Sequence, residues 1–208
     1  MARQRTTRGT SAAQTRRKLL DAGRAAFAEL GHDGVNLQRD ILDRAGVSTG
    51  SFYHQFADKT ELLVAILEEA VERAQSGLTA TLEATGDPVE GTRAGYELLF
   101  AMVDAAEDLV RIQFRERDNH DERVRRLLER IRQSWLDSLT ASYQRLTDRN
   151  PGFDPGQGAQ MVRALTIGVL FAYLDTPPKR RAALRKELID ALVPFTLGGL
   201  EALGARRT

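Results

Sequence analysis

The sequence predicts an all-α protein of about nine helices, with a small N-terminal three-helix domain followed by a larger C-terminal helical bundle. Three observations predict this class. Apolar residues recur at spacings of three and four through most of the chain. No stretch alternates like a β-strand, and no internal repeat occurs. Gly, Pro, Asp and Asn gather at a few breaks, which divide the chain into helix-length segments.

Composition sets limits on the function. The 208 residues are 42% hydrophobic and 28% charged, which is ordinary for a globular protein with a substantial core. The absence of Cys excludes disulfides, thiol nucleophiles and Cys-type zinc sites. No apolar run is long enough to span a bilayer, and the N-terminus lacks the apolar core of a signal peptide. We therefore expect a cytoplasmic location and no membrane partner.

The first segment, residues 1–12, is rich in Thr, Arg and Ser, and we expect it to be a basic arm that is disordered when free. The first twenty residues hold six basic side chains and no acidic one, although the whole chain carries a net charge of only +1. Arg3, Arg5 and Arg8 lie in the arm. Such an arm can be a solvated tail, but beside a nucleic-acid-binding motif it favours phosphate contact.

Residues 13–58 form the predicted three-helix domain. Its first helix spans residues 13–30 and ends at Gly31, which suits a left-handed position. The stretch from Asn36 to Glu61 then predicts two short helices around a tight turn at Gly46. Ser48 is a plausible N-cap for the second of these helices, and Phe52 and Phe56 are spaced to enter the core. Glu61 and Asp58 predict a capping box for the next helix.

This stretch resembles the TetR family of transcriptional regulators. The matching residues are Ile41, Ala45, Gly46, Val47, Ser48, Gly50, Phe52, Tyr53, Phe56, Lys59 and Leu62. The chain departs from the family pattern at Leu37, Gln38, Leu42 and Gln55. Because Leu37 replaces the usual capping Thr, Asn36 is the alternative cap for the first of the two short helices.

The resemblance implies that the motif binds double-stranded operator DNA. It places Thr49, Ser51 and His54 at base edges and lets the backbone approach the duplex at Gly50, while Tyr53 and Lys59 hold phosphates. The complete set of expected DNA-contacting residues is Arg3, Arg5, Arg8, Arg39, Ser48, Thr49, Gly50, Ser51, Tyr53, His54, Gln55 and Lys59.

Residues 59–205 are the expected ligand-binding and dimerisation domain. A helix begins at Lys59 and reaches the region of residues 78–82; the next spans residues 89–108, with Asp87 as its cap and Pro88 at its first position. Further helices are predicted over residues 109–117, 122–147, 158–174 and 178–203, the last kinked at Pro194.

The last two helices are the expected dimer interface, over residues 158–203. Residues 164–174 carry almost no charge, which fits either a bundle centre or a subunit contact, and the family resemblance favours a homodimer. A dimer also suits DNA recognition, since two motifs related by a two-fold axis read a palindrome.

The bundle interior is the expected site of a small hydrophobic or amphipathic effector. Its expected lining is Phe100, Val103, Phe114, Trp135, Leu139, Tyr143, Leu165 and Phe171. Each of these side chains could simply fill a core, but as a set they are typical of an apolar pocket between helices. Tyr143, Arg111, Arg115 and Gln113 are available to orient a polar end of the ligand.

Catalytic and metal-binding motifs are absent from the sequence. No nucleophile elbow, phosphate loop or dinucleotide fingerprint occurs, so no cofactor is expected. His120 lies among Asp118, Asp121 and Glu122 without the paired spacing of a metal site, and a solvated helix start is the simpler interpretation. The family resemblance implies a dimeric, ligand-responsive DNA-binding regulator, which in families of this kind is most often a repressor. Its rivals are a helix-turn-helix protein controlled by a protein partner or acting architecturally, and an enzyme or carrier with a helical body.

Overall fold

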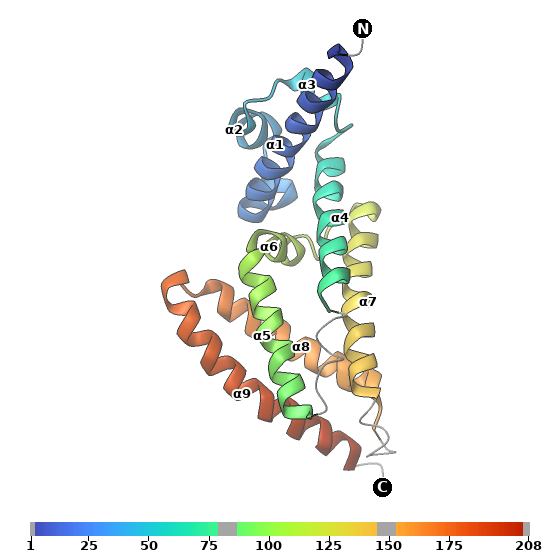
Figure 1. Ribbon diagram of the computed structural model, residues 1–208, viewed down its shortest axis with the longest axis vertical. Coiled ribbons are helices and arrows are strands. Elements are labelled where there is room, and N and C mark those ends of the chain that lie inside the picture. Colours follow the sequence, from blue (N-terminus) through green and yellow to red (C-terminus); the bar gives the residue numbers. More distant parts are fainter. Residues whose placement is uncertain (1–2, 79–86, 145–152, 206–208) are drawn as a thin grey trace. The chain divides into compact units, whose positions relative to one another are not determined.

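The computed structural model of the chain describes residues 3–78, 87–144 and 153–205, with side chains described over 12–72, 87–144 and 153–203. Every regular element in these ranges is helical, and the predicted all-α class is confirmed (Figure 1). The elements are α1 (Arg3–Gly34), the π-helical η1 (Leu37–Leu42), α2 (Asp43–Ala45), α3 (Thr49–Tyr53), α4 (Lys59–Leu78), α5 (Pro88–Ala105), α6 (Glu107–Arg115), α7 (Glu122–Gln144), α8 (Pro155–Asp175) and α9 (Pro178–Ala205). None of the described helices is long and apolar enough to cross a membrane.

The turns and caps of the N-terminal region follow the sequence closely. Gly31 and Gly46 have φ angles of 71° and 62°, which L side chains rarely adopt. Asn36 caps η1 by accepting the Arg39 N–H at 3.0 Å, and Ser48 caps α3 by accepting the Ser51 N–H at 3.2 Å. These caps fix where each short helix begins. The start of α3 in turn determines which of its side chains lie on each face of the helix.

The capping box of α4 is also present. Asp58 Oδ1 accepts the Glu61 N–H at 2.6 Å, and the Glu61 carboxylate accepts the Ala57 N–H. α4 therefore starts at a defined point, directly after the short loop that follows α3.

Two helices start three or more residues before the predicted position. α1 begins at Arg3, so the segment expected to be a disordered arm is helical from that residue, although its Thr, Ser and Gly residues are weak helix formers. α8 begins at Pro155 rather than at residue 158, because Asp154 accepts the Gly156 and Gln157 N–H groups and Pro155 occupies the first helical position. The expected extensions of α4 to residues 79–82 and of α7 to residues 145–147 lie outside the described residues.

The chain divides into two compact units that differ from the linear boundary expected at residue 58. The first unit comprises residues 1–73 and 106–131, and the second comprises residues 74–105 and 132–208. The difference arises because α6 and the start of α7 pack with α1 and α4, a long-range pairing that no local signal in the sequence reveals.

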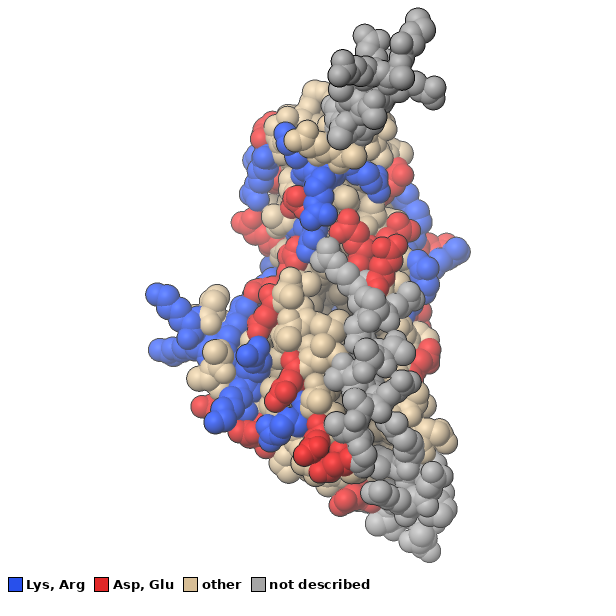
Figure 2. All heavy atoms as spheres, in the orientation of Figure 1, with Lys and Arg blue, Asp and Glu red and all other residues tan. Residues whose placement is uncertain are grey.

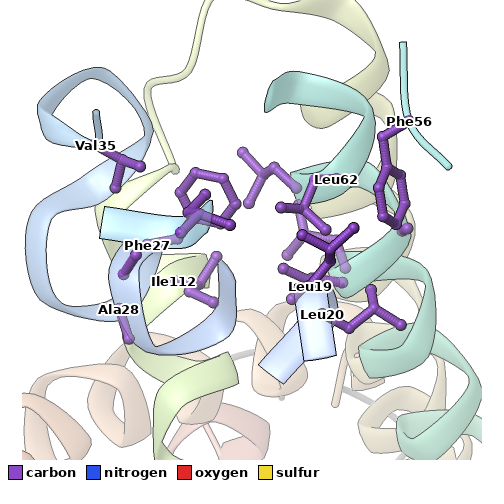
Figure 3. Packing of buried hydrophobic residues seen from close by; sticks show 14 of the residues in the cluster. Leu19, Leu20, Phe27, Ala28, Val35, Phe56, Leu62 and Ile112 are labelled. Atoms are coloured by element: carbon purple, nitrogen blue, oxygen red, sulfur yellow. The ribbon is translucent and has the colours of Figure 1, made fainter. Parts of the chain in front are cut away.

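The first unit has a continuous apolar core (Figure 3). Leu19 and Phe27 of α1, Phe56 after α3, Leu62 of α4 and Ile112 of α6 point toward one another, and each is at most 2% exposed. Fully burying one such side chain stabilises the fold by roughly 1.5–3 kcal/mol. The small helices of the motif are therefore fixed by α1, α4 and α6, because they are too short to be stable alone.

The second unit is built from α5, α8, α9 and part of α7. In Figure 1, α5 lies alongside α9. The Arg93 guanidinium lies 2.7 Å from the Asp190 carboxylate, and the Tyr173 hydroxyl donates to Asp104 at 2.7 Å. Arg181, itself buried, donates to backbone oxygens at the end of α8. α9 continues through Pro194 as one helix.

Candidate functional site

The face presented by α3 is set by its two phenylalanines. Phe52 is fully buried and Phe56 is 2% exposed, and their rings pack 5.8 Å apart. With these anchors inside, Thr49, Gly50, Tyr53 and His54 are exposed on the opposite side. Tyr53 is 57% exposed, a large aromatic surface left uncovered by its own unit. The structure thus brings together the four residues that a major-groove reading helix would use first.

Ser48, Ser51 and Gln55 are less available. The Ser48 and Ser51 hydroxyls lie 2.9 Å apart and bond each other, and Ser51 and Gln55 are half-buried. Gly50 is different, since a Cβ added there would meet nothing within 4 Å. The first unit has no packing need for this glycine, so the open space beside α3 is free for another molecule.

Gln38 links η1 to the reading helix. Thr49 Oγ1 donates to Gln38 Oε1 at 3.2 Å, and Gln38 Nε2 donates to Asp43 Oδ1 at 2.6 Å. The departure of Gln38 from the family pattern therefore has a local consequence, because the exposed Thr49 hydroxyl is held by a neighbour.

Lys59 makes two hydrogen bonds inside the first unit. Its ammonium donates to the backbone oxygens of His32 at 2.6 Å and Val35 at 2.9 Å. Two of its three protons thus satisfy carbonyl groups at the end of α1. Lys59 thus holds α4 against the turn after α1, and the phosphate contact of its third proton stays a prediction.

Many of the described basic side chains of the first unit are held by carboxylates. Arg17 pairs with Asp21, Arg24 with Asp108 and Arg44 with Glu29, at 3.2, 2.7 and 3.4 Å. Figure 2 shows the same mixture on the drawn face, where basic and acidic side chains are interspersed. A guanidinium that already bridges a carboxylate in its own unit must exchange that bond to hold a DNA phosphate.

Arg39 keeps its exposure despite such a pair. Its guanidinium forms two hydrogen bonds with Asp40, at 2.7 and 2.9 Å, while 71% of its side chain is exposed. This pairing, together with the Asn36 N–H, lowers the pKa of the Asp40 carboxyl to about 2. Arg39 is thus a fixed positive charge beside the motif.

Arg16 is a candidate that the sequence did not indicate. Its guanidinium lies over the Phe56 ring, 4.6 Å from the centroid, and it has no carboxylate partner among the described residues. A cation held on an aromatic face keeps its N–H groups for another acceptor. The contact joins residues forty positions apart, so only the structure shows it. The side chains of Arg3, Arg5 and Arg8 lie outside the described residues.

α6 is tied to α1 by polar contacts within the first unit. Glu116 Oε1 accepts the His32 N–H at 2.6 Å, and Arg115 Nε donates to the Ala28 oxygen at 2.8 Å. Arg111 bonds Glu107 at 2.8 Å. Arg111 and Arg115, expected to orient a ligand's polar end, are thus engaged in the first unit.

The expected effector lining is only partly brought together. Phe100, Val103, Trp135, Leu139, Tyr143 and Leu165 belong to the second unit, where Phe100 and Val103 are buried and the other four are half-buried. Phe114 belongs to the first unit, and Phe171 is 38% exposed on α8. At these two positions, as at the other six, the effector lining stays a prediction.

The first unit also has a shallow surface groove. Val64 and Leu127 form its floor, and the charged residues Glu68, Arg123, Arg126, Glu129 and Arg130 line the rest. Arg123 bonds Asp121 at 2.9 Å, and Arg126 bonds Glu122. Arg123 lowers the pKa of the Asp121 carboxyl to about 2, so this acid near His120 has a local cationic partner.

Comparison with known proteins addresses the family. Residues 19–66, which span the motif, match the family described as bacterial regulatory proteins, tetR family. The chain is 24% identical over 199 residues to the HTH-type transcriptional activator FasR of Mycolicibacterium smegmatis, covering 94% of this chain and 87% of that protein. It is 31% identical over 78 residues to the HTH-type transcriptional repressor AcnR of Corynebacterium diphtheriae, covering 35% and 40%.

Solved structures share the fold. A putative transcriptional regulator from Pseudomonas aeruginosa PAO1 matches with a TM-score of 0.73 at 19% identity, over 93% of both chains. AibR, solved in complex with isovaleryl coenzyme A and operator DNA, matches with a TM-score of 0.70 at 19% identity, over 87% of this chain and 97% of that one.

Proposed function

This chain belongs to the TetR family of helix-turn-helix transcriptional regulators, and we propose that it binds a palindromic operator as a homodimer and is released by a small, largely apolar effector. It is a DNA-binding regulator and not an enzyme. The observation that carries the proposal is α3, a short helix anchored by buried Phe52 and Phe56 with its opposite face open.

In the proposed complex, α3 lies in the major groove. Thr49 and His54 reach base edges, and Gly50 allows close approach of the duplex. Tyr53, Arg39 and Arg16 contact the phosphate backbone, while Ser48 and Ser51 act mainly through the cap that they form. The N-terminal turns of α1, with Arg3, Arg5 and Arg8, add positive charge near the same DNA.

The proposed dimer interface uses α8 and α9. Met161, Phe171 and Phe195 are 51%, 38% and 67% exposed, a large apolar surface for one protomer to leave open. Three glycines in these helices, Gly168, Gly198 and Gly199, have nothing within 4 Å of an added Cβ. Helix-interior glycine costs roughly 1 kcal/mol relative to alanine. Because packing inside the protomer does not require these glycines, we infer that a partner helix approaches there.

The proposed effector site is the interior of the second unit. Trp135, Leu139, Tyr143 and Leu165 are only half-buried although they lie on helices that pack together, which is consistent with room for a ligand. AibR, of similar fold, is described in complex with both an acyl coenzyme A and operator DNA. An effector releases DNA only if it binds the DNA-free form more tightly than the bound form.

We expect the bound dimer to repress, since occupying an operator is enough to exclude other proteins. FasR is named an activator and AcnR a repressor, so a promoter–reporter fusion with and without the protein tests the sign. The rival interpretation, control by a protein partner, predicts DNA binding without release by any small molecule.

The decisive experiment selects operator DNA in vitro with the full chain and then follows its release. Selected sites should be palindromic and should bind two protomers, as measured by sedimentation with fluorescent DNA. Hydrophobic compounds that raise the melting temperature are then added to the complex. Release by such a compound supports the whole proposal. Palindromic binding without release by any stabilising compound removes the effector and favours the rival.

A further inference from the structure

We propose that Asp40 positions Arg39 to bind one phosphate of the operator backbone through two parallel hydrogen bonds. Asp40 takes one edge of the guanidinium and the phosphate takes the other. Asp40 is therefore a positioning residue that does not itself touch DNA. The inference rests on the operator complex proposed above and adds the residue that orients one of its contacts.

Asp40 is a buried carboxylate with a fixed orientation. Only 5% of its side chain is exposed. Its Oδ2 accepts the Asn36 N–H at 2.8 Å, while the Asn36 side chain accepts the Arg39 N–H at 3.0 Å. Reciprocal bonds of this kind fix the first turn of a helix. The carboxylate is thus part of the start of η1 and holds the Arg39 guanidinium from below.

The Arg39 guanidinium is bonded on one edge only. Its Nε donates to Asp40 Oδ1 at 2.7 Å, and its Nη2 donates to Asp40 Oδ2 at 2.9 Å. Of the five N–H groups of a guanidinium, three therefore remain, two on Nη1 and one on Nη2. One N–H of each nitrogen forms an outer edge, whose parallel geometry matches two oxygens of a phosphate. Among the described residues, none accepts a hydrogen bond from this outer edge.

Arg24 shows that the pairing alone does not make a phosphate site. Its Nε and Nη2 donate to Asp108 at 2.7 and 3.1 Å, the same two-bond arrangement. Only 12% of the Arg24 side chain is exposed, however, against 71% for Arg39. The arrangement thus joins α1 to α6 in one case and leaves an accessible donor edge in the other. Arg39 can keep both bonds to Asp40 while its outer edge binds a phosphate.

Arg39 lies next to the contact between η1 and α3. The preceding residue, Gln38, accepts the Thr49 hydroxyl proton at 3.2 Å. In helix-turn-helix proteins the helix before the reading helix crosses the DNA backbone. An exposed guanidinium on η1 therefore meets a phosphate rather than a base edge.

The experiment replaces single phosphates of the selected operator by neutral methylphosphonates and measures the affinity of the full chain for each duplex. At one position of each half-site, wild-type binding should weaken by about tenfold because the Arg39 contact is lost. Arg39→Lys keeps the charge but lacks the two-pronged edge, so it should bind the unmodified operator about tenfold more weakly and lose most of the effect at that position. Asp40→Asn should lose the effect at the same position, since one amide oxygen cannot accept both guanidinium bonds.

Glu29→Gln is the matched control. It removes one negative charge from the same unit and frees Arg44, whose guanidinium lies 3.4 Å from Glu29, but it leaves the bonds between Arg39 and Asp40 intact. It should leave the effect of every methylphosphonate unchanged. If Asp40 acted only through its charge, Asp40→Asn and Glu29→Gln would both bind DNA more tightly, with the same methylphosphonate effects as the wild type.

Melting temperatures identify conditions in which each variant is folded. The inference is overturned if Arg39→Lys retains every methylphosphonate effect, a result that counts even if Asp40→Asn does not fold. It is also overturned if folded Asp40→Asn keeps the effect that Arg39→Lys loses, or if Arg39→Lys changes only the base preference. Failure of the wild type to bind any selected operator would instead remove the proposed operator complex itself.

Discussion

Thr49 donates its hydroxyl proton to the side-chain oxygen of Gln38, so the first residue of the reading helix α3 is oriented by the π-helical segment η1. The Gln38 amide is in turn held by Asp43. Thr49 is exposed, and because its proton is used its oxygen can only accept, which suits the amino groups of adenine or cytosine. This contact makes Gln38 a positioning residue for sequence recognition.

Gln38→Ala and Thr49→Val should therefore weaken the base preference at the same base pair of the operator. Each loss of discrimination should be about 1–3 kcal/mol, and the double variant should lose little more than either single variant. In vitro selection with all four proteins, together with melting temperatures, measures this. Relaxation at two separate base pairs with additive losses would mean that Gln38 contacts DNA by itself.

Arg16→Ala should weaken binding to all DNA sequences alike. Its guanidinium has no carboxylate to leave, so removing it should lower the slope of log affinity against log salt by about one. Arg17→Ala is the matched control, because Arg17 is already bridged to Asp21. Equal slopes for Arg16→Ala and the wild type would remove Arg16 from the interface.

Lys59→Met should destabilise the fold more than it weakens non-specific DNA binding. It leaves the His32 and Val35 carbonyl oxygens without their donor, and unsatisfied buried groups typically cost about 1–3 kcal/mol each. Urea unfolding measures the loss, and a salt titration of DNA affinity measures the second effect. If the slope of log DNA affinity against log salt fell by about one while the free energy of unfolding stayed unchanged, Lys59 would instead be a phosphate contact.

Gly168→Leu should separate folding from dimerisation. The added side chain meets open space in the protomer, so the unfolding free energy of the monomer should not fall. The dimer dissociation constant should rise at least about tenfold, because helices that approach over a glycine cannot accommodate leucine. Sedimentation equilibrium measures it, with Ala101→Leu on the exposed face of α5 as the control. An unchanged dissociation constant would place the interface elsewhere.

The Asp40 carboxyl should make the stability of the fold depend on pH in the acidic range. Its pKa is lowered to about 2 from an ordinary 3.8, so it adds stability that is fully present above pH 3.8 and is lost as the pH falls toward 2. Wild type should exceed Asp40→Asn in stability by a constant margin above that range, and the margin should shrink below it. Denaturant unfolding at closely spaced pH values measures the margin. A margin that grows on acidification would contradict the Arg39–Asp40 pair.

Local signals in the sequence predicted the motif well. Gly46, Ser48 and the Asp58–Glu61 box act within a few residues, so the chain shows them directly. The start of α8 could have been predicted too, because Asp154-Pro155 repeats the cap-and-proline signature recognised at Asp87-Pro88. The surrounding glycines and Pro151 are typical of a loop, so a loop was predicted there instead.

Long-range contacts could not be predicted in the same way. The bond from Lys59 to His32 and the stacking of Arg16 on Phe56 depend on how helices pack, which periodicity does not specify. The exposure of Phe171 had the same cause, since a nearly uncharged helix gives little sign of its inward face.

The assembly of the first unit from two separated stretches limits how regulators of this kind can be recombined. A chimera that exchanges only residues 1–58 would leave Leu109, Ile112, Val124 and Leu127, which complete its core, to the other parent. It would also separate Arg24 from Asp108 and His32 from Glu116. A transplantable reading head must therefore include residues 106–131 with residues 3–73, so engineered exchange of operator specificity requires three crossovers within one gene, after residues 73, 105 and 131, rather than one.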